Sequence, residues 1–193
     1  MTSRPGGRSA RVREAVLEAV YAELNRHGYA GMTVENVAER AGVHKTTVYR
    51  RWGTVDVLIA DALDHTRESE WPVPDTGTLE GDLIAVATEI ADTFADPERR
   101  LVPIAIVIAA QQSTRAQDAK RRFYAARQAE AAKVVTRAVE RGELPPQADP
   151  VELVRLTCAP LYHRIFVTGE PVDRPTAERS ARAALAAARA GLL

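Results

Sequence analysis

Residues 42–52, GVHKTTVYRRW, hold a dense group of side chains suited to contacting a negatively charged partner. Three cations (Lys45, Arg50 and Arg51), two threonines and a tyrosine fall within these eleven positions. Lysine and arginine contact phosphates or guanine edges, threonine donates to phosphate or touches the thymine methyl group, and a tyrosine hydroxyl donates to phosphate. The residue types therefore fit a nucleic-acid contact, but the same cations would also fit an ordinary solvated helix face.

The elements on both sides of this segment bear on that choice. Thr33 is a good N-cap for a helix over TVENVAERA, and Glu35 is favourably placed near the positive end of that helix. Gly42 ends this helix, and Thr54 can cap the next long one. A short helix over 44–52 therefore follows the preceding helix after a turn of about three residues.

Two short helices joined by a glycine-containing turn match a helix-turn-helix, whose second helix lies in the DNA major groove. Ala38 supplies a small residue for close packing, Gly42 the turn and Val43 the apolar residue after it. A helix this short has little intrinsic stability, so Val43, Val48 and Trp52 must pack against neighbouring helices. The residues expected on or near the outward face are Lys45, Thr46, Thr47, Tyr49 and Arg50.

The rest of the chain predicts an all-α fold, because apolar residues recur at helical spacing and no convincing stretch alternates as a strand would. The first helix has an apolar stripe from Val12 to Leu24 and stops at Gly28. The further helices are expected at 54–70, 78–95, 97–101, 103–113, 115–141, 150–168 and 175–190. Proline-rich breaks at 71–77, 142–150 and 168–175 separate the long ones.

Size and composition exclude several classes of protein. The 193 residues are 46% hydrophobic, enough for a core without a metal or a disulfide. The single cysteine, Cys158, fits a reducing compartment, so we expect a cytoplasmic location. The basic residues 1–14 lack the apolar core of a secretory signal, and the apolar run 101–110 is about half the length that a bilayer span needs. We therefore expect neither export nor a membrane partner.

The net charge of zero hides an asymmetry along the chain. Residues 1–53 carry nine Lys or Arg and five Glu, a net charge of +4, and the remainder carries seventeen against twenty-one, a net charge of −4. A polyanion is one partner for this basic third. A second class of function also fits it, namely a helical adaptor that binds an acidic protein.

Residues 33–63, TVENVAERAGVHKTTVYRRWGTVDVLIADAL, resemble the DNA-binding segment of the TetR/AcrR family of bacterial transcriptional regulators. The resemblance covers about residues 10–65. Its pattern is a capping Thr, an Ala-rich helix, A-G-V, a short recognition helix ending in Tyr, then an aromatic residue and a capped helix. The matching positions are Thr33, Ala38, Ala41, Gly42, Val43, Tyr49, Trp52 and Thr54.

The resemblance implies an N-terminal three-helix helix-turn-helix domain joined by a fourth helix to a C-terminal helical ligand-binding and dimerisation domain. On this basis residues 1–53 are the basic arm and DNA-binding domain, 54–70 the connecting helix, and 54–193 the regulatory and dimerisation region. It also implies a homodimer on a pseudo-palindromic operator in double-stranded DNA, repression as the usual mode, and release by a small effector. Few predicted pocket residues are charged, which favours a mainly apolar effector.

The DNA-binding residues that the resemblance implies are Thr33, His44, Lys45, Thr46, Thr47, Tyr49, Arg50 and Arg51. Among them Lys45, Thr46 and Thr47 are expected at base edges or nearby phosphates, and the basic arm with Arg4, Arg8 and Arg11 adds a further contact. Two positions depart from the family pattern. His44 stands where a small capping residue is usual, and Val55 replaces a common phosphate-binding lysine.

For the C-terminal region the resemblance implies that helices 115–141 and 150–168 pair with their copies as a four-helix bundle. The apolar residues expected at that dimer contact are Phe123, Val134, Val135, Ala138, Val139, Leu153, Val154, Leu161 and Ile165. The alternative is that both helices close their own subunit.

The candidate pocket residues, chosen by position, are Trp71, Phe94, Ile104, Ile108, Gln111, Gln112, Phe123 and His163. The alternative is that most of them are plain core residues.

An enzyme is disfavoured by the residues themselves. Cys158 and His163 are five positions apart, which on one helix separates them by about 140°. The four histidines show no metal-ligand spacing, and the sequence has no glycine-rich phosphate loop or nucleophile elbow. We therefore expect no catalytic residue, no cofactor and no metal.

Overall fold

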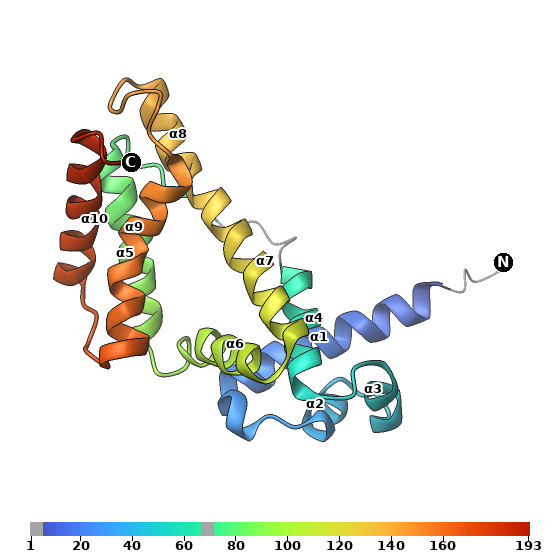
Figure 1. Cartoon of the computed structure of the whole chain (residues 1–193). Coiled ribbons are helices and arrows are strands. Elements are labelled where there is room, and N and C mark those ends of the chain that lie inside the picture. Colours follow the sequence, from blue (N-terminus) through green and yellow to red (C-terminus); the bar gives the residue numbers. More distant parts are fainter. Residues whose placement is uncertain (1–5, 67–71) are drawn as a thin grey trace. The chain divides into compact units, whose positions relative to one another are not determined.

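The computed structural model describes residues 6–66 and 72–193, and within these ranges all regular structure is helical. The all-α prediction is therefore confirmed. The chain divides into two compact units (Figure 1). Unit 1 combines Met1–Ser69 with Glu98–Tyr124, and unit 2 combines Glu70–Pro97 with Ala125–Leu193.

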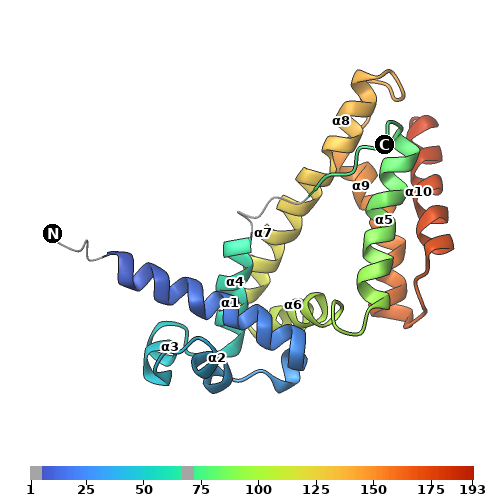
Figure 2. The ribbon, with the colours of Figure 1, turned by 180° about the vertical axis from the view of Figure 1, so that it is seen from behind.

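Unit 1 is built from the N-terminal helices and a segment that returns to them later in the chain (Figure 2). Its helices are α1 (Gly6–Gly31), α2 (Val34–Arg40), α3 (Lys45–Arg51), α4 (Val55–Thr66), α6 (Leu101–Gln112) and the first part of α7 (Thr114–Ala131). Helix α1 contacts α2, α4 and α6, and α2 contacts α3. The buried side chains of these helices form one core, which includes Val16, Leu17, Val20, Val37, Val48, Leu58, Ile59, Ala105 and Ile106.

The predicted stop of the first helix is confirmed at Gly28. Its backbone leaves the helix at φ 63° and ψ −171°, and helical turns resume as far as Gly31. A positive φ of this size favours glycine, and a Cβ at this position would lie 3.5 Å from Leu101 Cδ2. Gly28 thus allows the chain to turn at a point where Leu101 of α6 packs close to the backbone.

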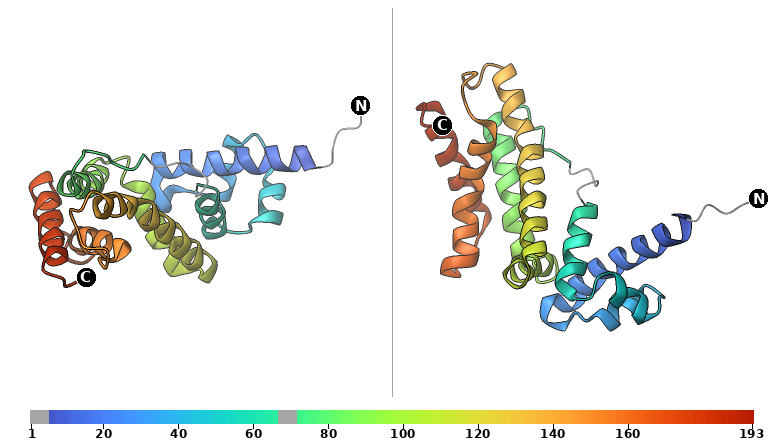
Figure 3. Two further views of the ribbon diagram at one scale, coloured as in Figure 1. Left: turned by 90° about the horizontal axis from the view of Figure 1, so that it is seen from above. Right: turned by 45° about the vertical axis from the view of Figure 1, so that its right-hand side comes forward.

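Unit 2 contains α5 (Leu79–Ala95), the rest of α7, α8 (Lys133–Glu140), α9 (Pro150–His163), a π-helical turn (Arg164–Thr168) and α10 (Arg174–Arg189). Helices α5, α9 and α10 contact one another and run side by side (Figure 3). Two buried clusters fill the unit, and their larger members are Leu79, Leu83, Val134, Val135, Leu144, Leu153, Val154, Leu161 and Leu185.

Several helix bounds differ from the sequence prediction. A short piece at 97–101 and a helix at 103–113 were expected, but one helix, α6, runs from Leu101 to Gln112. Pro103 fits in its first turn because the missing N–H has no intrahelical acceptor there. The helix expected over 115–141 is divided into α7 and α8 near Ala132, and the one expected over 150–168 ends in the π-helical turn.

The compact units also divide the chain differently from the predicted boundary. The sequence assigned 54–193 to a single C-terminal region, whereas α4 and α6 belong to unit 1. Ala105, Ile106 and Ala109 of α6 are the reason, because they are buried in the core shared with α1 and α4. The functional boundary at residue 53 stays a prediction.

The structure corrects the predicted dimer residues. Six of them are buried within the core of unit 2, namely Val134, Val135, Ala138, Leu153, Val154 and Leu161. A side chain without exposed surface cannot contact a second copy, so these six side chains pack within their own subunit. The pairing of the two helices with their copies stays a prediction. Val139, Ile165 and Phe123 are half-buried, and Phe123 packs on the core of unit 1.

Candidate nucleic-acid interface

The turn between α2 and α3 has the geometry that the sequence predicts. Thr33 caps α2, with its hydroxyl accepting from the Asn36 backbone N–H at 3.1 Å. At the other end Gly42 has φ 64°, its N–H donates to the Glu39 carbonyl, and the Val43 N–H donates to the Ala38 carbonyl. This pair of bonds is a Schellman motif, which satisfies the last carbonyls of α2 and turns the chain into α3.

His44 caps α3 in place of the small residue that the family pattern would supply. Its Nδ1 accepts from the Thr46 backbone N–H at 3.4 Å and lies 2.8 Å from the Thr46 hydroxyl oxygen. His44 therefore caps the first turn of α3 and also contacts the Thr46 side chain.

Replacing His44 tests this cap. We expect His44→Ala to lower the free energy of unfolding by about 1 kcal/mol, because an orphan N–H of the first turn loses its acceptor. His44→Ser should retain most of the stability, since serine is a strong capping residue. Urea denaturation followed by circular dichroism measures both changes. Equal stability of the alanine and serine variants would show that the cap contributes nothing.

The inward side of α3 is held by a tryptophan and a carboxylate. Val48 is fully buried, Trp52 is 4% exposed, and the Trp52 indole N–H donates to Asp61 Oδ2 of α4 at 2.9 Å. Arg13 of α1 donates to both oxygens of the same carboxylate, at 3.1 and 2.8 Å. Burial acts to raise the pKa of Asp61, but the hydrogen bonds from Arg13 and Trp52 outweigh it and lower the pKa. The ionised Asp61 therefore joins α1, α3 and α4.

Two further polar contacts attach the neighbouring helices to α1. The Tyr29 hydroxyl donates to Asp56 of α4 at 2.6 Å, and burial together with this bond raises the pKa of Tyr29 to about 12. The nearly buried Glu23 accepts from Arg40 of α2 at 2.5 Å. Helices α2 and α4 are thus fixed on α1, and α3 lies on this support.

The outward side of α3 presents most of the predicted residues together. Lys45, Thr46, Tyr49 and Arg50 are exposed, and their spacing places them on one side of the helix. We call these four residues the recognition surface. Thr47 is half-buried, and its predicted contact with DNA stays a prediction.

Arg51 is exposed but points back toward α1 and the core. Its guanidinium carbon lies 5.0 Å from the centre of the Trp52 ring, a cation–π distance, and its Nη1 donates to the Ser9 hydroxyl at 3.4 Å. This residue therefore lies at the edge of the recognition surface.

Sequence reasoning missed one polar contact on this surface. The Tyr49 hydroxyl donates to Oε1 of Glu35 at 2.8 Å, although Tyr49 remains 44% exposed. Glu35 was noted only for its favourable position at the N-terminal end of α2. A pair fourteen residues apart on two helices has no local sequence signal.

The predicted ligand residues fall in both units. Phe94 and His163 are in unit 2, where Phe94 makes edge-to-face contacts with Phe166 and Tyr162 at 5.5 and 6.4 Å between ring centres. Those in unit 1 are Ile104 and Phe123, which are half-buried, and Ile108, Gln111 and Gln112, which are exposed. Trp71, Arg4 and the side chain of Arg8 lie outside the described residues. A binding site formed by these residues stays a prediction.

The described residues give little support for a reactive thiol, a metal site or a membrane span. Burial raises the pKa of the Cys158 thiol to about 12, so it holds almost no thiolate near neutral pH. In the ranges 6–66 and 72–193, no group of three or more His, Cys, Asp or Glu side chains is arranged to hold a metal ion. Among the helices of the described part of the chain, none is both long and apolar enough to cross a membrane.

Comparison with known families decides what this arrangement is. Residues 16–62 match the family model described as "Bacterial regulatory proteins, tetR family", and residues 73–184 match "Tetracyclin repressor-like, C-terminal domain". The chain belongs to the TetR family. The TetR family consists of transcriptional regulators that bind DNA through a helix-turn-helix, and α2 and α3 form such a motif in this chain. The members of this family are regulators and not enzymes.

Relatives and solved structures agree with the TetR assignment. The HTH-type transcriptional regulator AqdR of Rhodococcus erythropolis is 36% identical over 169 residues, which cover 88% of this chain and 80% of AqdR. The DNA-binding transcriptional repressor TetR of Mycobacteroides abscessus is 33% identical over 175 residues, covering 90% and 89%. The crystal structure of the TetR family transcription regulator SCO0332 superposes with a TM-score of 0.72 at 30% identity, covering 91% and 97%.

Proposed function

We propose that this TetR-family protein is a ligand-responsive repressor that binds a pseudo-palindromic operator as a homodimer. The observation that carries the proposal is the contrast in α3 between buried and exposed side chains. Val48 and Trp52 are buried, while Lys45 in the first turn and Tyr49 and Arg50 in the last turn are exposed. A short helix that is anchored by buried side chains and presents exposed cations fits the recognition helix of a helix-turn-helix.

The side chains of the recognition surface divide into two roles. Lys45 and Thr46 lie in the first turn of α3, the end that contacts base edges when a recognition helix enters the major groove. Arg50, one turn later, suits a phosphate of the DNA backbone. Thr33 caps α2 as an acceptor, so its hydroxyl hydrogen is free to donate to a phosphate.

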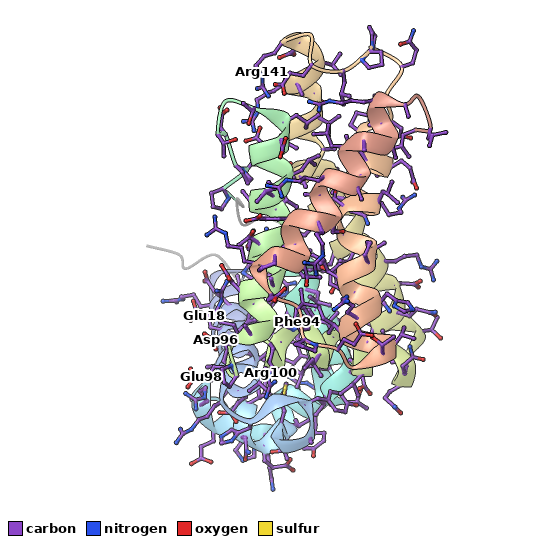
Figure 4. The ribbon with its side chains drawn as sticks, turned by 90° about the vertical axis from the view of Figure 1, so that its left-hand side faces the viewer. Glu18, Phe94, Asp96, Glu98, Arg100 and Arg141 are labelled. Atoms are coloured by element: carbon purple, nitrogen blue, oxygen red, sulfur yellow. The ribbon has the colours of Figure 1, made fainter. Side chains whose placement is uncertain are left out.

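A second copy would supply the second recognition surface. Two copies related by a twofold axis can bind half-sites about 34–36 Å apart, or a multiple of this distance. Because six of the nine predicted dimer residues are buried, we place the contact on the adjacent helices α9 and α10, which face the viewer in Figure 4. Ala159 and Pro160 of α9 and Ala183 and Ala186 of α10 are exposed, and small side chains let helices pack closely.

Release by a small, mainly apolar effector would act through α4. Asp61 of α4 binds Trp52 beside α3, and Asp56 of α4 binds Tyr29 of α1. A shift of α4 would therefore change how α3 is held on its support. Coupling of about 1–3 kcal/mol between effector and DNA is typical of such regulation.

Binding of purified protein to random duplex DNA, with selection and sequencing of the bound fraction, tests the function directly. We expect a palindromic consensus with two half-sites, and an affinity that falls steeply with salt. No enrichment and no retention at low salt would contradict the proposal and favour the adaptor alternative. Sedimentation that shows only monomer at micromolar concentration would contradict the homodimer.

Substitutions on α3 separate the two roles. We expect Arg50→Ala to weaken binding to all sequences by a similar factor and to reduce the salt slope by about one. Lys45→Ala should also change the preferred base at one position of each half-site, by about tenfold to a hundredfold. The matched control is Arg121→Ala, which removes an exposed cation of α7 paired with Asp118. Fluorescence anisotropy against the selected operator and single-base variants measures all three.

A further inference from the structure

We propose that Glu35 is an internal competitor for DNA phosphate, which occupies the Tyr49 hydroxyl in the free protein and so lowers affinity for every duplex. This inference rests on the proposed function, because it concerns the same DNA-binding surface. It assigns a regulatory role to a carboxylate that lies among the cations of a DNA-binding face.

The first step is the hydrogen-bond capacity of tyrosine. A phenol has a single O–H donor, and in this structure Tyr49 donates it to Glu35 Oε1 at 2.8 Å. A phosphate oxygen is only an acceptor, so it needs the same hydrogen. Tyr49 cannot donate to both anions, and binding to phosphate requires the bond to Glu35 to break.

The second step is the charge of the competitor. The hydrogen bond from Tyr49 is the main cause that lowers the pKa of Glu35, and the nearby Lys45 also lowers it. Glu35 is therefore ionised at neutral pH. A full negative charge in the first turn of α2, close to Lys45 and Tyr49, repels an approaching phosphate and offsets part of the attraction of the cations.

The third step is that the fold does not depend on this bond. Both side chains are exposed, whereas α2 and α3 are held by the buried residues Val37, Val48 and Trp52. An exposed polar pair contributes little to stability. Removing the carboxylate should therefore change DNA binding without unfolding the helices.

The test compares Glu35→Gln with wild type on the operator and on unrelated duplex DNA. Glutamine keeps the length of the side chain and loses the charge. We expect affinity for both duplexes to rise about threefold to tenfold, with only the small loss of stability that follows from removing a negative charge at the first turn of α2. Glu18→Gln is the matched control, because it removes an exposed carboxylate of α1 outside the recognition surface and should change affinity by less than about twofold.

A double-mutant cycle with Tyr49→Phe separates competition for the hydroxyl from charge repulsion alone. In wild type the Tyr49 hydroxyl already donates to Glu35, so removing this hydroxyl by Tyr49→Phe should cost little affinity for DNA. In the Glu35→Gln background the hydroxyl is available to phosphate, and Tyr49→Phe should then cost at least about threefold more than it does in wild type. This larger loss supports the proposal.

Three outcomes would overturn the inference. Equal losses from Tyr49→Phe in both backgrounds would mean that Glu35 acts by charge alone. If the DNA affinity of Glu35→Gln is equal to or below that of wild type, Glu35 does not compete with phosphate at all. A change confined to one base of the operator would instead make Glu35 a base-reading residue. Wild-type protein that binds no duplex would contradict the proposed function itself, which is a different and separately visible result.

Discussion

The Trp52→Ala variant is expected to lose operator binding together with about 3–5 kcal/mol of the free energy of unfolding of unit 1. Trp52 ends α3 and is 4% exposed, so alanine would leave a large cavity beneath the recognition surface. Its indole N–H also donates to Asp61 of α4. Because folded domains are stable by only about 5–15 kcal/mol, this loss is large.

Trp52→Ala is expected to impair DNA binding more than it impairs the folding of the rest of the chain, because Trp52 lies next to α3. A helix of seven residues does not persist without packing, and Val48 with Trp52 supplies that packing. Without the indole ring, Lys45 and Arg50 would lose their common orientation. We expect the operator affinity to fall to the level of non-specific binding or below.

Trp52→Phe is the matched control for this prediction. Phenylalanine keeps an aromatic ring in the core but removes the donor to Asp61, which Arg13 still binds. We expect an intermediate loss of about 1–2 kcal/mol and measurable operator binding. Urea denaturation and anisotropy titration give the two quantities. A Trp52→Ala variant with wild-type affinity would contradict the view that this ring positions α3.

The second large effect is expected in unit 2, at the buried carboxylate of Asp82. This side chain has no exposed surface, and its Oδ1 accepts from the Thr76 backbone N–H at 2.6 Å and from the Thr76 hydroxyl at 2.8 Å. Its Oδ2 lies 3.8 Å from Arg137 and 3.9 Å from Arg141, near the end of α8 (Figure 4). The carboxylate therefore joins the segment before α5 to α8.

Asp82→Ala is expected to lower the free energy of unfolding by about 2–4 kcal/mol. The substitution removes the acceptor of the Thr76 backbone N–H and the buried carboxylate beside two arginines, which keep Asp75 and Glu143 as partners. Both arginines are partly exposed, so water compensates part of the loss, which keeps the value below that of a fully buried ion pair.

Two variants on α5 control for this prediction. Asp82→Asn keeps an acceptor for Thr76 and loses the charge, so its effect should lie between wild type and alanine. Asp92→Ala removes an exposed carboxylate of the same helix and should change stability by less than about 0.5 kcal/mol. Urea denaturation followed by circular dichroism compares the three variants. Equal effects of Asp82→Ala and Asp92→Ala would show that the buried carboxylate has no special role.

Much of the DNA-binding half could be predicted from sequence because its signals are local. The cap at Thr33, the stop at Gly28 and the turn at Gly42 each depend on backbone groups within a few residues. The order and spacing of these signals identify the helix-turn-helix, and family comparison agrees. The exposed position of Arg50 follows from helical periodicity once Val48 is assigned to the core, because two positions along a helix turn a side chain by about 200°.

The predicted dimer residues show where this reasoning ends. Helical periodicity finds the apolar side of the segment holding Val134 and Val135 and of the segment holding Leu153 and Leu161. It cannot tell whether a second copy or the same subunit covers that side. The structure shows that other helices of unit 2 cover all four residues.

By itself, then, the sequence determined the all-α class, the cap at Thr33, the turn before α3 and the family of regulators, since these depend on neighbouring residues and on residue order. Tertiary structure alone decided that α6 joins unit 1, that Asp82 is buried and that Glu35 holds Tyr49. Each of these features joins residues of different helices. Such contacts form only when the helices pack, and no periodicity along one helix specifies what covers it.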